Sequence, residues 1–501
     1  MSTFADIKPL WMPFTASLIG WCVMRVLSSQ FSWDIDFEQR PILIAVTVLV
    51  MQWAALFWAH FEARKLKNSA HKRATIMIII VGGCLFHFIF IGSTPIQEND
   101  ANRYLWDGAV SSQGVSPYKY TPSQVNSFSS GRNPDYELAK LQQFVVEDKS
   151  AQTHLDRVSY KEVHTIYPPT AQLLFYIAYK ATGWSWDGLR FLFISAYFGG
   201  VLLTLTAQAE LMGYGTATIQ SAIFLGWNPL AVKEIANCAH LDAVLVLWFG
   251  AIVYLFKYRN SILYSLIIGA LAGLAILTKI YPLLIIPVII AASLRISIQK
   301  AICIAISTTA VVVVWYGSYL VDDGAVVFSG FNEFTSTWLR NAGLFSLIND
   351  ALLYVWGSEY MSLPLVPGGK GPTGTVAAKI LVLLIVLGVV FAQAFRDWKL
   401  SLNDYTSFAH SSMLILMAWF LLLPMAYPWY LLGLISFAAP SRVGICFWVL
   451  AASIHCGYNL LFYSEYHNCP IYVDKIIVII EYSVPFGYFF LSKRNQAGGS
   501  L

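Results

Sequence analysis

The sequence predicts an all-α protein, a polytopic bundle of about 12 or 13 transmembrane helices with a long external loop that bears short interfacial helices. Hydrophobic residues make up 57% of the 501 residues and charged residues 12%. That charged share is about half the share in an average soluble domain. Apolar runs close to the roughly 20 residues needed to cross a bilayer recur along the whole chain. The mean hydropathy of +0.60 agrees with this pattern, so an ordinary soluble protein is excluded.

The first three apolar segments, residues 10–29, 41–61 and 75–93, set the orientation of the chain. The link after the second segment is strongly basic and contains Arg64, Lys65, Lys67, Lys72 and Arg73. The positive-inside rule places that link in the cytoplasm, and residues 94–165 then lie outside. A cysteine at Ser129 should therefore react with an impermeant thiol reagent from outside, whereas one at Ser69 should not.

Further apolar segments follow on both sides of a second polar stretch, residues 321–375. They cover residues 168–181, 191–211, 217–227, 241–256, 262–277, 282–294, 301–320, 376–394, 412–424, 430–439, 443–462 and 471–491. The loop 94–165 is expected outside and the basic Lys257 inside, so the chain between them must cross the membrane an odd number of times. The first four of these segments lie between the two, which is one too many. One of the two short segments, 168–181 or 217–227, is therefore expected not to cross.

These segments divide the chain into three parts. Residues 1–74 form an N-terminal transmembrane hairpin, and residues 75–320 form a central module that includes the external loop 94–165. Residues 321–501 form a C-terminal module with the external loop 321–375.

The loop 94–165 opens with acids and a guanidinium in the run ENDANRYLWDG, residues 98–108. On a helix Asp100 and Arg103 are three residues apart, and Arg103 and Asp107 are four apart. One helical face can therefore carry a carboxylate, a guanidinium and a second carboxylate, with Glu98 just before it. The alternative is a solvated interfacial helix with ordinary ion pairs.

Residues 228–242 place polar groups between two strongly apolar segments, and these groups include Lys233, Asn237, His240 and Asp242. Ionisable groups at membrane depth usually face a bundle interior or an aqueous cavity. Lys279 repeats the pattern between two apolar segments. The alternatives are a short surface loop with a hydrogen-bonded histidine, and a lysine whose amine reaches the membrane surface.

Three further positions carry polar or aromatic groups near segment ends. Tyr167 precedes a proline pair that suits the start of a helix. Arg340 lies in the second polar stretch. Tyr427 and Trp429 end an apolar segment, which indicates either an aromatic belt at the membrane surface or a platform for a sugar or prenyl chain.

Read in order, the motifs RYLWDG, GVSPYKYTP, TIYPP, NPLAVKEIANCAHLD, LTKIYP, RNAGLF and YPWY resemble the bacterial dolichyl-phosphate-mannose mannosyltransferase-like members of the GT-C superfamily. The resemblance covers roughly residues 97–430 and extends more loosely to the first mannosyltransferase of GPI-anchor synthesis and to the polyprenol-phosphate-mannose enzymes of actinobacteria. The chain departs from the family pattern in three places. Asn99 separates the two acids, Ser116 stands where asparagine is usual, and three apolar segments precede the loop instead of one.

The resemblance implies transfer of a hexose, expected to be mannose, from a polyprenyl-phosphate sugar to a lipid or glycan acceptor. The acid that such enzymes carry in the first external loop corresponds to Asp100, with Glu98 as the alternative general base. The cations expected to hold the donor phosphate are Arg103, Lys233, Lys279 and Arg340. The residues expected to bind substrate are Tyr104, Trp106, Asp107, Tyr167, Asn237, His240, Asp242, Tyr427 and Trp429. One base opposite one leaving group implies a single displacement, which inverts the configuration at the anomeric carbon of the sugar.

We expect no cofactor and no metal, because the donor carries a single phosphate, although His240 and Asp242 could bind an ion. No nucleic-acid partner is expected, since the net charge is only +4 and no basic stripe is present. The expected location is the bacterial inner membrane, with membrane lipids around the bundle and the active site facing the periplasm.

Two other functions fit many of the same features. A transporter or flippase of lipid-linked sugars would also have many spans and buried polar groups, but such proteins tend to show internal repeats, which this sequence lacks. A ligase that moves a preassembled lipid-linked glycan would be a transferase of a different kind.

Overall fold

A computed structural model describes residues 7–68, 72–127, 135–362, 370–399, 405–441 and 445–498. Ser69 and Ser129 lie outside the described residues. Helices make up 81% of the structure and strands 1%, which confirms the all-α prediction. Within the described residues the strands form one antiparallel hairpin, β1 (Tyr360–Ser362) with β2 (Lys370–Pro372).

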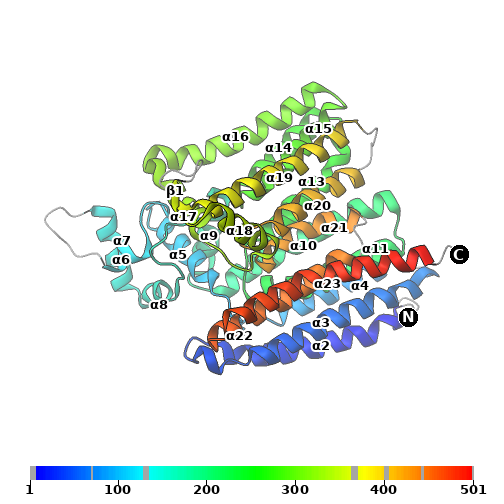
Figure 1. Ribbon diagram of the computed structural model, residues 1–501, viewed down its shortest axis with the longest axis horizontal. Coiled ribbons are helices and arrows are strands. Elements are labelled where there is room, and N and C mark those ends of the chain that lie inside the picture. The colour runs from blue at the N-terminus through cyan, green and yellow to red at the C-terminus, as the bar shows by residue number, and fades with distance from the viewer. Residues whose placement is uncertain are drawn as a thin grey trace.

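Long apolar helices form the body of the bundle (Figure 1). Six helical segments in the described part of the chain are long and apolar enough to cross a membrane, which supports a membrane protein. They contain α2 (Lys8–Leu27), α3 (Ile42–Glu62), α10 (Trp186–Met212), α16 (Ile298–Asp323), α19 (Thr373–Lys399) and α22 (Ile445–Tyr466). The expected total of about 12 or 13 membrane helices stays a prediction.

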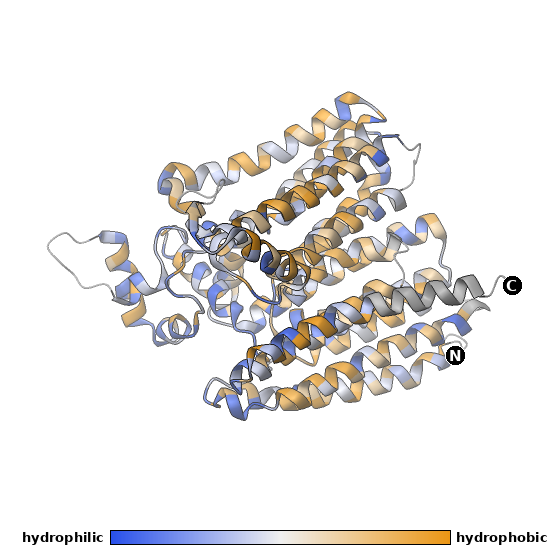
Figure 2. Cartoon of the chain, in the orientation of Figure 1, coloured by the Kyte–Doolittle hydropathy of each residue, from blue (hydrophilic) through white to orange (hydrophobic). Residues whose placement is uncertain are grey.

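Shorter helices complete the bundle. They are α4 (Lys72–Phe88), α11 (Thr216–Gly226), α13 (Ala243–Leu255), α14 (Ile262–Ile276), α15 (Ile286–Leu294), α18 (Gly343–Trp356), α20 (Tyr405–Leu421) and α21 (Leu432–Ser441). The 28-residue α23 (Ile471–Gly498) lies at the C-terminal end. Single turns join many of them, namely η1 (Ser28–Phe31), η2 (Phe37–Gln39), η3 (Ala63–Asn68), η5 (Phe256–Tyr258), η6 (Tyr281–Ile285), η7 (Gly324–Phe328) and η8 (Pro428–Leu431). Orange, hydrophobic residues dominate the middle of the bundle, and blue residues gather toward its two ends (Figure 2).

The two ends of the bundle differ. Both chain termini lie at one end, here called the terminal end, and the loop 94–165 covers the opposite end, here called the loop end (Figure 1). The loop contains α5 (Asp100–Ser112), α6 (Pro122–Ser127), α7 (Tyr136–Glu147) and α8 (Lys149–Arg157). These helices share a small hydrophobic core of their own, which includes Trp106, Leu141 and Leu155. The loop is therefore a folded unit, with the short helices that the sequence predicted.

Four apolar segments lie between the loop and Lys257, and one of them was expected not to cross the membrane. In the structure the segment that stays at one end of the bundle is α9 (Pro169–Thr182). It packs against α5, and just beyond its end Trp184 Nε1 donates to Asp148 of the loop at 2.7 Å. Both ends of α9 thus stay with the loop end. The next helix, α10, reaches the terminal end, where Glu210 and Lys257 form an ion pair.

The chain then returns through α11, α12 (Pro229–Ala231) and η4 (Val232–Asn237, a π-helix), before α13 leads back to the terminal end. Asn237 marks the turning point, since its side chain donates to Ser93 and Thr94 at the start of the loop. The chain thus runs between the two ends of the bundle three times here, in α10, in the interrupted α11–η4 segment and in α13. The number of these runs that cross a membrane stays a prediction. Segment 217–227 is short because its pass is interrupted by polar residues.

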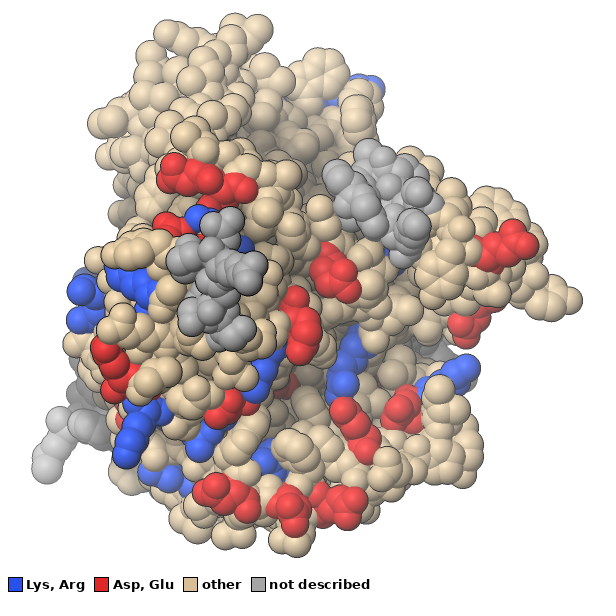
Figure 3. Space-filling model, turned by 90° about the vertical axis from the view of Figure 1, so that its left-hand side faces the viewer, with Lys and Arg blue, Asp and Glu red and all other residues tan. Residues whose placement is uncertain are grey.

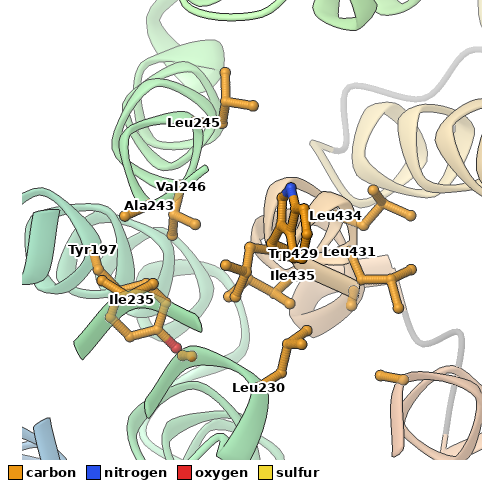
Figure 4. Close-up of a cluster of buried hydrophobic side chains, with 14 of the residues drawn as sticks. Tyr197, Leu230, Ile235, Ala243, Leu245, Val246, Trp429, Leu431, Leu434 and Ile435 are labelled. Carbon is orange, nitrogen blue, oxygen red and sulfur yellow. The ribbon is translucent and has the colours of Figure 1, made fainter. Parts of the chain in front are cut away.

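Close helix packing supports this turn. Gly200 of α10 and Gly250 of α13 lie at a tight crossing, and a Cβ atom on Gly200 would lie 2.2 Å from the carbonyl oxygen of Val246. Small residues allow such approaches between membrane helices. Next to the crossing, Leu230 and Ile235 meet side chains of the η8–α21 segment in a buried apolar cluster (Figure 4). Residues 228–242 are therefore held firmly within the bundle.

Candidate active site

A cavity of about 1340 Å³ opens at the loop end. It is larger than the roughly 300–1,000 Å³ typical of small-ligand pockets. Charged residues of both signs gather on this face of the molecule (Figure 3). Eight of the predicted site residues line the cavity, namely Glu98, Asp100, Arg103, Tyr167, Lys279, Arg340, Tyr427 and Trp429. The structure thus brings together groups from positions far apart in the sequence.

The two candidate acids lie on the same wall. Asp100 is the first residue of α5, its side chain is 32% exposed, and its Oδ2 accepts a hydrogen bond from Tyr167 Oη at 3.4 Å. Glu98 is buried in the segment before α5. Burial raises the pKa of Glu98 to about 7, although Lys233 and His240 act in the opposite direction. Asp100 is therefore the more exposed of the two carboxyl groups.

A buried polar chain lies behind Asp100. His240 Nδ1 is 4.0 Å from Asp100 Oδ2, and His240 Nε2 is 3.2 Å from Glu234 Oε2. The other oxygen of Glu234 lies 3.0 Å from Lys233 Nζ and 3.3 Å from His455 Nε2. Ionisable groups at membrane depth are costly unless they are paired. In this buried polar chain each such group lies beside a partner, and His240 lies beside Asp100.

Three of the four predicted phosphate-binding cations face the cavity, each held by an acid. Arg103 Nε is 2.9 Å from Asp107, as the spacing of four residues predicted, and its Nη2 has no hydrogen-bond partner among the described residues. Lys279 Nζ lies 2.6 Å from Asp242 Oδ2 and 4.4 Å from the centre of the Tyr430 ring. Each of these two cations can reach an anion in the cavity while it keeps its structural partner.

The third of these cations, Arg340, comes from the second polar stretch, residues 321–375. Its Nη2 lies 2.7 Å from Glu465, and its Nε has no hydrogen-bond partner within the described part of the chain. The backbone of Arg340 forms a short parallel bridge with Met425, which joins this loop to the segment before η8. The cavity wall therefore includes residues of all three predicted parts of the chain.

Aromatic side chains form one side of the cavity. Tyr427 and Trp429 stack with ring centres 4.7 Å apart, and Trp429 stacks on His240 at 3.9 Å. Both aromatic residues are buried in the cavity wall. The stack therefore links the wall to the polar chain behind Asp100.

The other seven predicted residues lie behind the cavity wall, namely Tyr104, Trp106, Asp107, Lys233, Asn237, His240 and Asp242. Tyr104 stacks on Phe175, and Trp106 belongs to the small core of the loop. Asp107 accepts hydrogen bonds from Thr165 and Gln172, so it ties α5 to the start of α9. These seven residues therefore pack against the segments that line the cavity and do not line it themselves.

Strained backbone surrounds the same site. Five described residues other than glycine have positive φ angles, and four of them lie near the cavity, namely Gln97, Tyr160, Ala239 and Asn341, with φ of 69°, 55°, 56° and 51°. Gln97 precedes Glu98, Ala239 precedes His240, and Asn341 follows Arg340. Such conformations cost about 1–3 kcal/mol each and cluster at functional sites.

Several residues of the site were not predicted from the sequence. His455 of α22 completes the polar chain, Glu465 holds Arg340, and Lys379 of α19 lines the cavity while it donates to two backbone carbonyls of α17 (Ser329–Thr337). A histidine or lysine inside an apolar segment was the available signal for His455 and Lys379.

His240 and Asp242 have separate partners, Glu234 and Lys279. Among the described residues no group of three or more His, Cys, Asp and Glu side chains is placed to hold a metal ion. No protein-family model, no curated protein and no solved structure matches the chain.

Proposed function

We propose that the protein is a membrane glycosyltransferase that transfers a hexose from a polyprenyl-phosphate donor to a lipid or glycan acceptor. Mannose is the expected sugar, and the non-cytoplasmic face is the expected side. The observation that carries the proposal is one cavity in which an accessible carboxylate, Asp100, lies with three cations and an apolar arm. These are the groups needed for a base, a phosphate site and a prenyl site.

The apolar arm supports a lipid donor. Its lining includes Ile380 and Leu383 of α19 and Leu283 of η6. Leu283 is 54% exposed and Leu383 41% exposed, so the arm reaches the apolar outer surface of the bundle. A prenyl chain can therefore remain in lipid while its phosphate reaches Lys279, which lies close to Leu283 in the chain.

The proposed reaction is a single displacement. Asp100 takes the proton from an acceptor hydroxyl, whose oxygen bonds to the anomeric carbon as the bond from that carbon to the phosphate oxygen breaks. The electron pair leaves with the phosphate, and Lys279, Arg340 and Arg103 stabilise the added negative charge. One attack opposite one leaving group inverts the anomeric configuration.

In this scheme His240 and Lys233 act indirectly. His240 lies between Asp100 and Glu234 and orients the base. Lys233 neutralises Glu234 and does not line the cavity, so we assign it no contact with the donor phosphate.

A transfer assay tests the proposal. The purified protein is incorporated into liposomes with radiolabelled polyprenyl-phosphate mannose or glucose and a panel of lipid acceptors. Label should move to an acceptor, and nucleotide sugars should be inert as direct donors. Movement of intact donor across the bilayer without transfer would support the flippase instead, and transfer of only a preassembled glycan would support the ligase.

A further inference from the structure

The N-terminal hairpin contributes its own side chains to the cavity. The segment between α2 and α3, residues 31–40, supplies six lining residues, namely Phe31, Ser32, Trp33, Asp34, Phe37 and Arg40. This part of the lining, here called the polar arm, includes Asp34 and Arg40 and is more polar than the mainly aliphatic lining from α19.

This segment is firmly attached to the rest of the protein. The buried guanidinium of Arg40 donates to the carbonyls of Ser32 and Ile35 and lies 4.3 Å from the centre of the Phe37 ring. Phe37 stacks on Tyr466, just beyond Glu465, with ring centres 4.7 Å apart. The hairpin segment is thus joined to the end of α22 that holds Arg340.

The segment also faces the helix that carries Asp100. The guanidinium carbon of Arg157 lies 5.8 Å from the centre of the Trp33 ring. The backbone carbonyl of Arg157 accepts hydrogen bonds from Asn99 at 3.2 Å and Asn102 at 3.5 Å. Trp33 therefore contacts a residue whose backbone carbonyl is bonded to the start of α5.

The chemistry of this polar arm suits a sugar. The indole of Trp33 is 45% exposed, and Tyr160, whose ring packs at a tilt against Trp338 with ring centres 4.1 Å apart, adds a second ring. A pyranose can place its C–H face on such rings while its hydroxyl groups bond to carboxylates and guanidinium groups. Asp34 and Arg157 supply both types of group on the same lining.

We infer that the segment 31–40 forms the acceptor site and binds an uncharged sugar residue of the acceptor next to Asp100. This inference rests on the proposed function. Charges of both signs line the polar arm, which favours a neutral ligand over an anionic one. The hairpin is then part of the functional site of the enzyme.

Photo-crosslinking tests the site without turnover. The probes are a mannoside, a glucoside and a galactoside, each with a diazirine on its alkyl chain. At least one should label residues 31–40 or 157–160 of the reconstituted protein, and excess unlabelled methyl glycoside should reduce the labelling. Trp33→Ala should lower labelling about tenfold, because one aromatic contact is removed, and Trp33→Phe should retain most of it. The control is Trp11→Ala, since Trp11 is exposed and lies outside the cavity lining.

Kinetics separate this inference from the proposed function. In the transfer assay Trp33→Ala should raise the acceptor KM about tenfold and leave the donor KM unchanged. Labelling confined to other segments, absence of labelling with all three probes, or an unchanged acceptor KM would overturn the acceptor site while the transferase stands. Labelling at residues 31–40 in a protein that transfers no polyprenyl-phosphate hexose would instead overturn the proposed function.

Discussion

The pair formed by Lys279 and Asp242 gives the sharpest test of the phosphate site, because each partner has a structural role and only one faces the cavity. Lys279 Nζ is 2.6 Å from Asp242 Oδ2, and no described residue forms a hydrogen bond with Asp242 Oδ1. Lys279→Met therefore leaves a buried carboxylate without its cation. Breaking such a pair costs about 3–5 kcal/mol of stability, so the single variant should yield little folded protein.

The double variant Lys279→Met with Asp242→Asn separates folding from donor binding. It removes both charges, and replacement of a buried ion pair by neutral groups is often nearly neutral for stability. Folding should therefore recover. Loss of one charged hydrogen bond to the phosphate, about 1.5–3 kcal/mol, should still raise the donor KM by about 10- to 150-fold.

Thermal unfolding at one fixed scan rate and donor kinetics provide the two measurements. Asp242→Asn alone is the matched control, because it keeps the lysine and should retain a donor KM near that of the wild type. A folded double variant with an unchanged donor KM would show that Lys279 is only the counter-ion of Asp242. That result would remove it from the phosphate site.

Three further predictions concern the base, its neighbour and the orientation of the chain. His240→Gln should lower kcat by about 10²-fold at an unchanged donor KM, because Asp100 then loses its alignment with the acceptor hydroxyl. An unchanged kcat would exclude a positioning role for His240. The raised pKa of Glu98, about 7 against an ordinary 4.5, means that the folded protein retains a proton that the unfolded chain releases. Stability should therefore fall as pH rises through that interval, and Glu98→Gln should reduce the difference in unfolding temperature between acidic and neutral buffer. With the native cysteines replaced, Ser127→Cys should react with an impermeant thiol reagent from outside and Lys65→Cys should not; the reverse pattern would contradict the external active site.

Local features of the fold could be predicted from the sequence. The acids at the start of the external loop and the pair formed by Arg103 and Asp107 follow from spacing along one helix, and the structure contains that pair. The polar segment 228–242 could be recognised because ionisable groups stand out between apolar runs.

Long-range contacts could not be predicted in the same way. His240 meets Asp100 across 140 residues, and His455 meets Glu234 across more than 200, so no local pattern records either contact. The position of α9 was also ambiguous, because its 14 residues are apolar whether the helix crosses or lies beside the loop. Spacing along the chain likewise gave no indication that residues 31–40 return to the cavity.

The central claim is that Asp100 is the general base of a sugar transfer, and turnover of Asp100→Asn at saturating donor and acceptor tests it most directly. The amide keeps the size of the side chain but cannot take the proton. The rate of transfer should therefore fall by about 10²- to 10⁴-fold, while donor affinity and the unfolding temperature stay unchanged. Glu98→Gln, measured in parallel, should lose less. A larger loss in Glu98→Gln would move the base to Glu98, and transfer at the wild-type rate by both folded variants would contradict the mechanism.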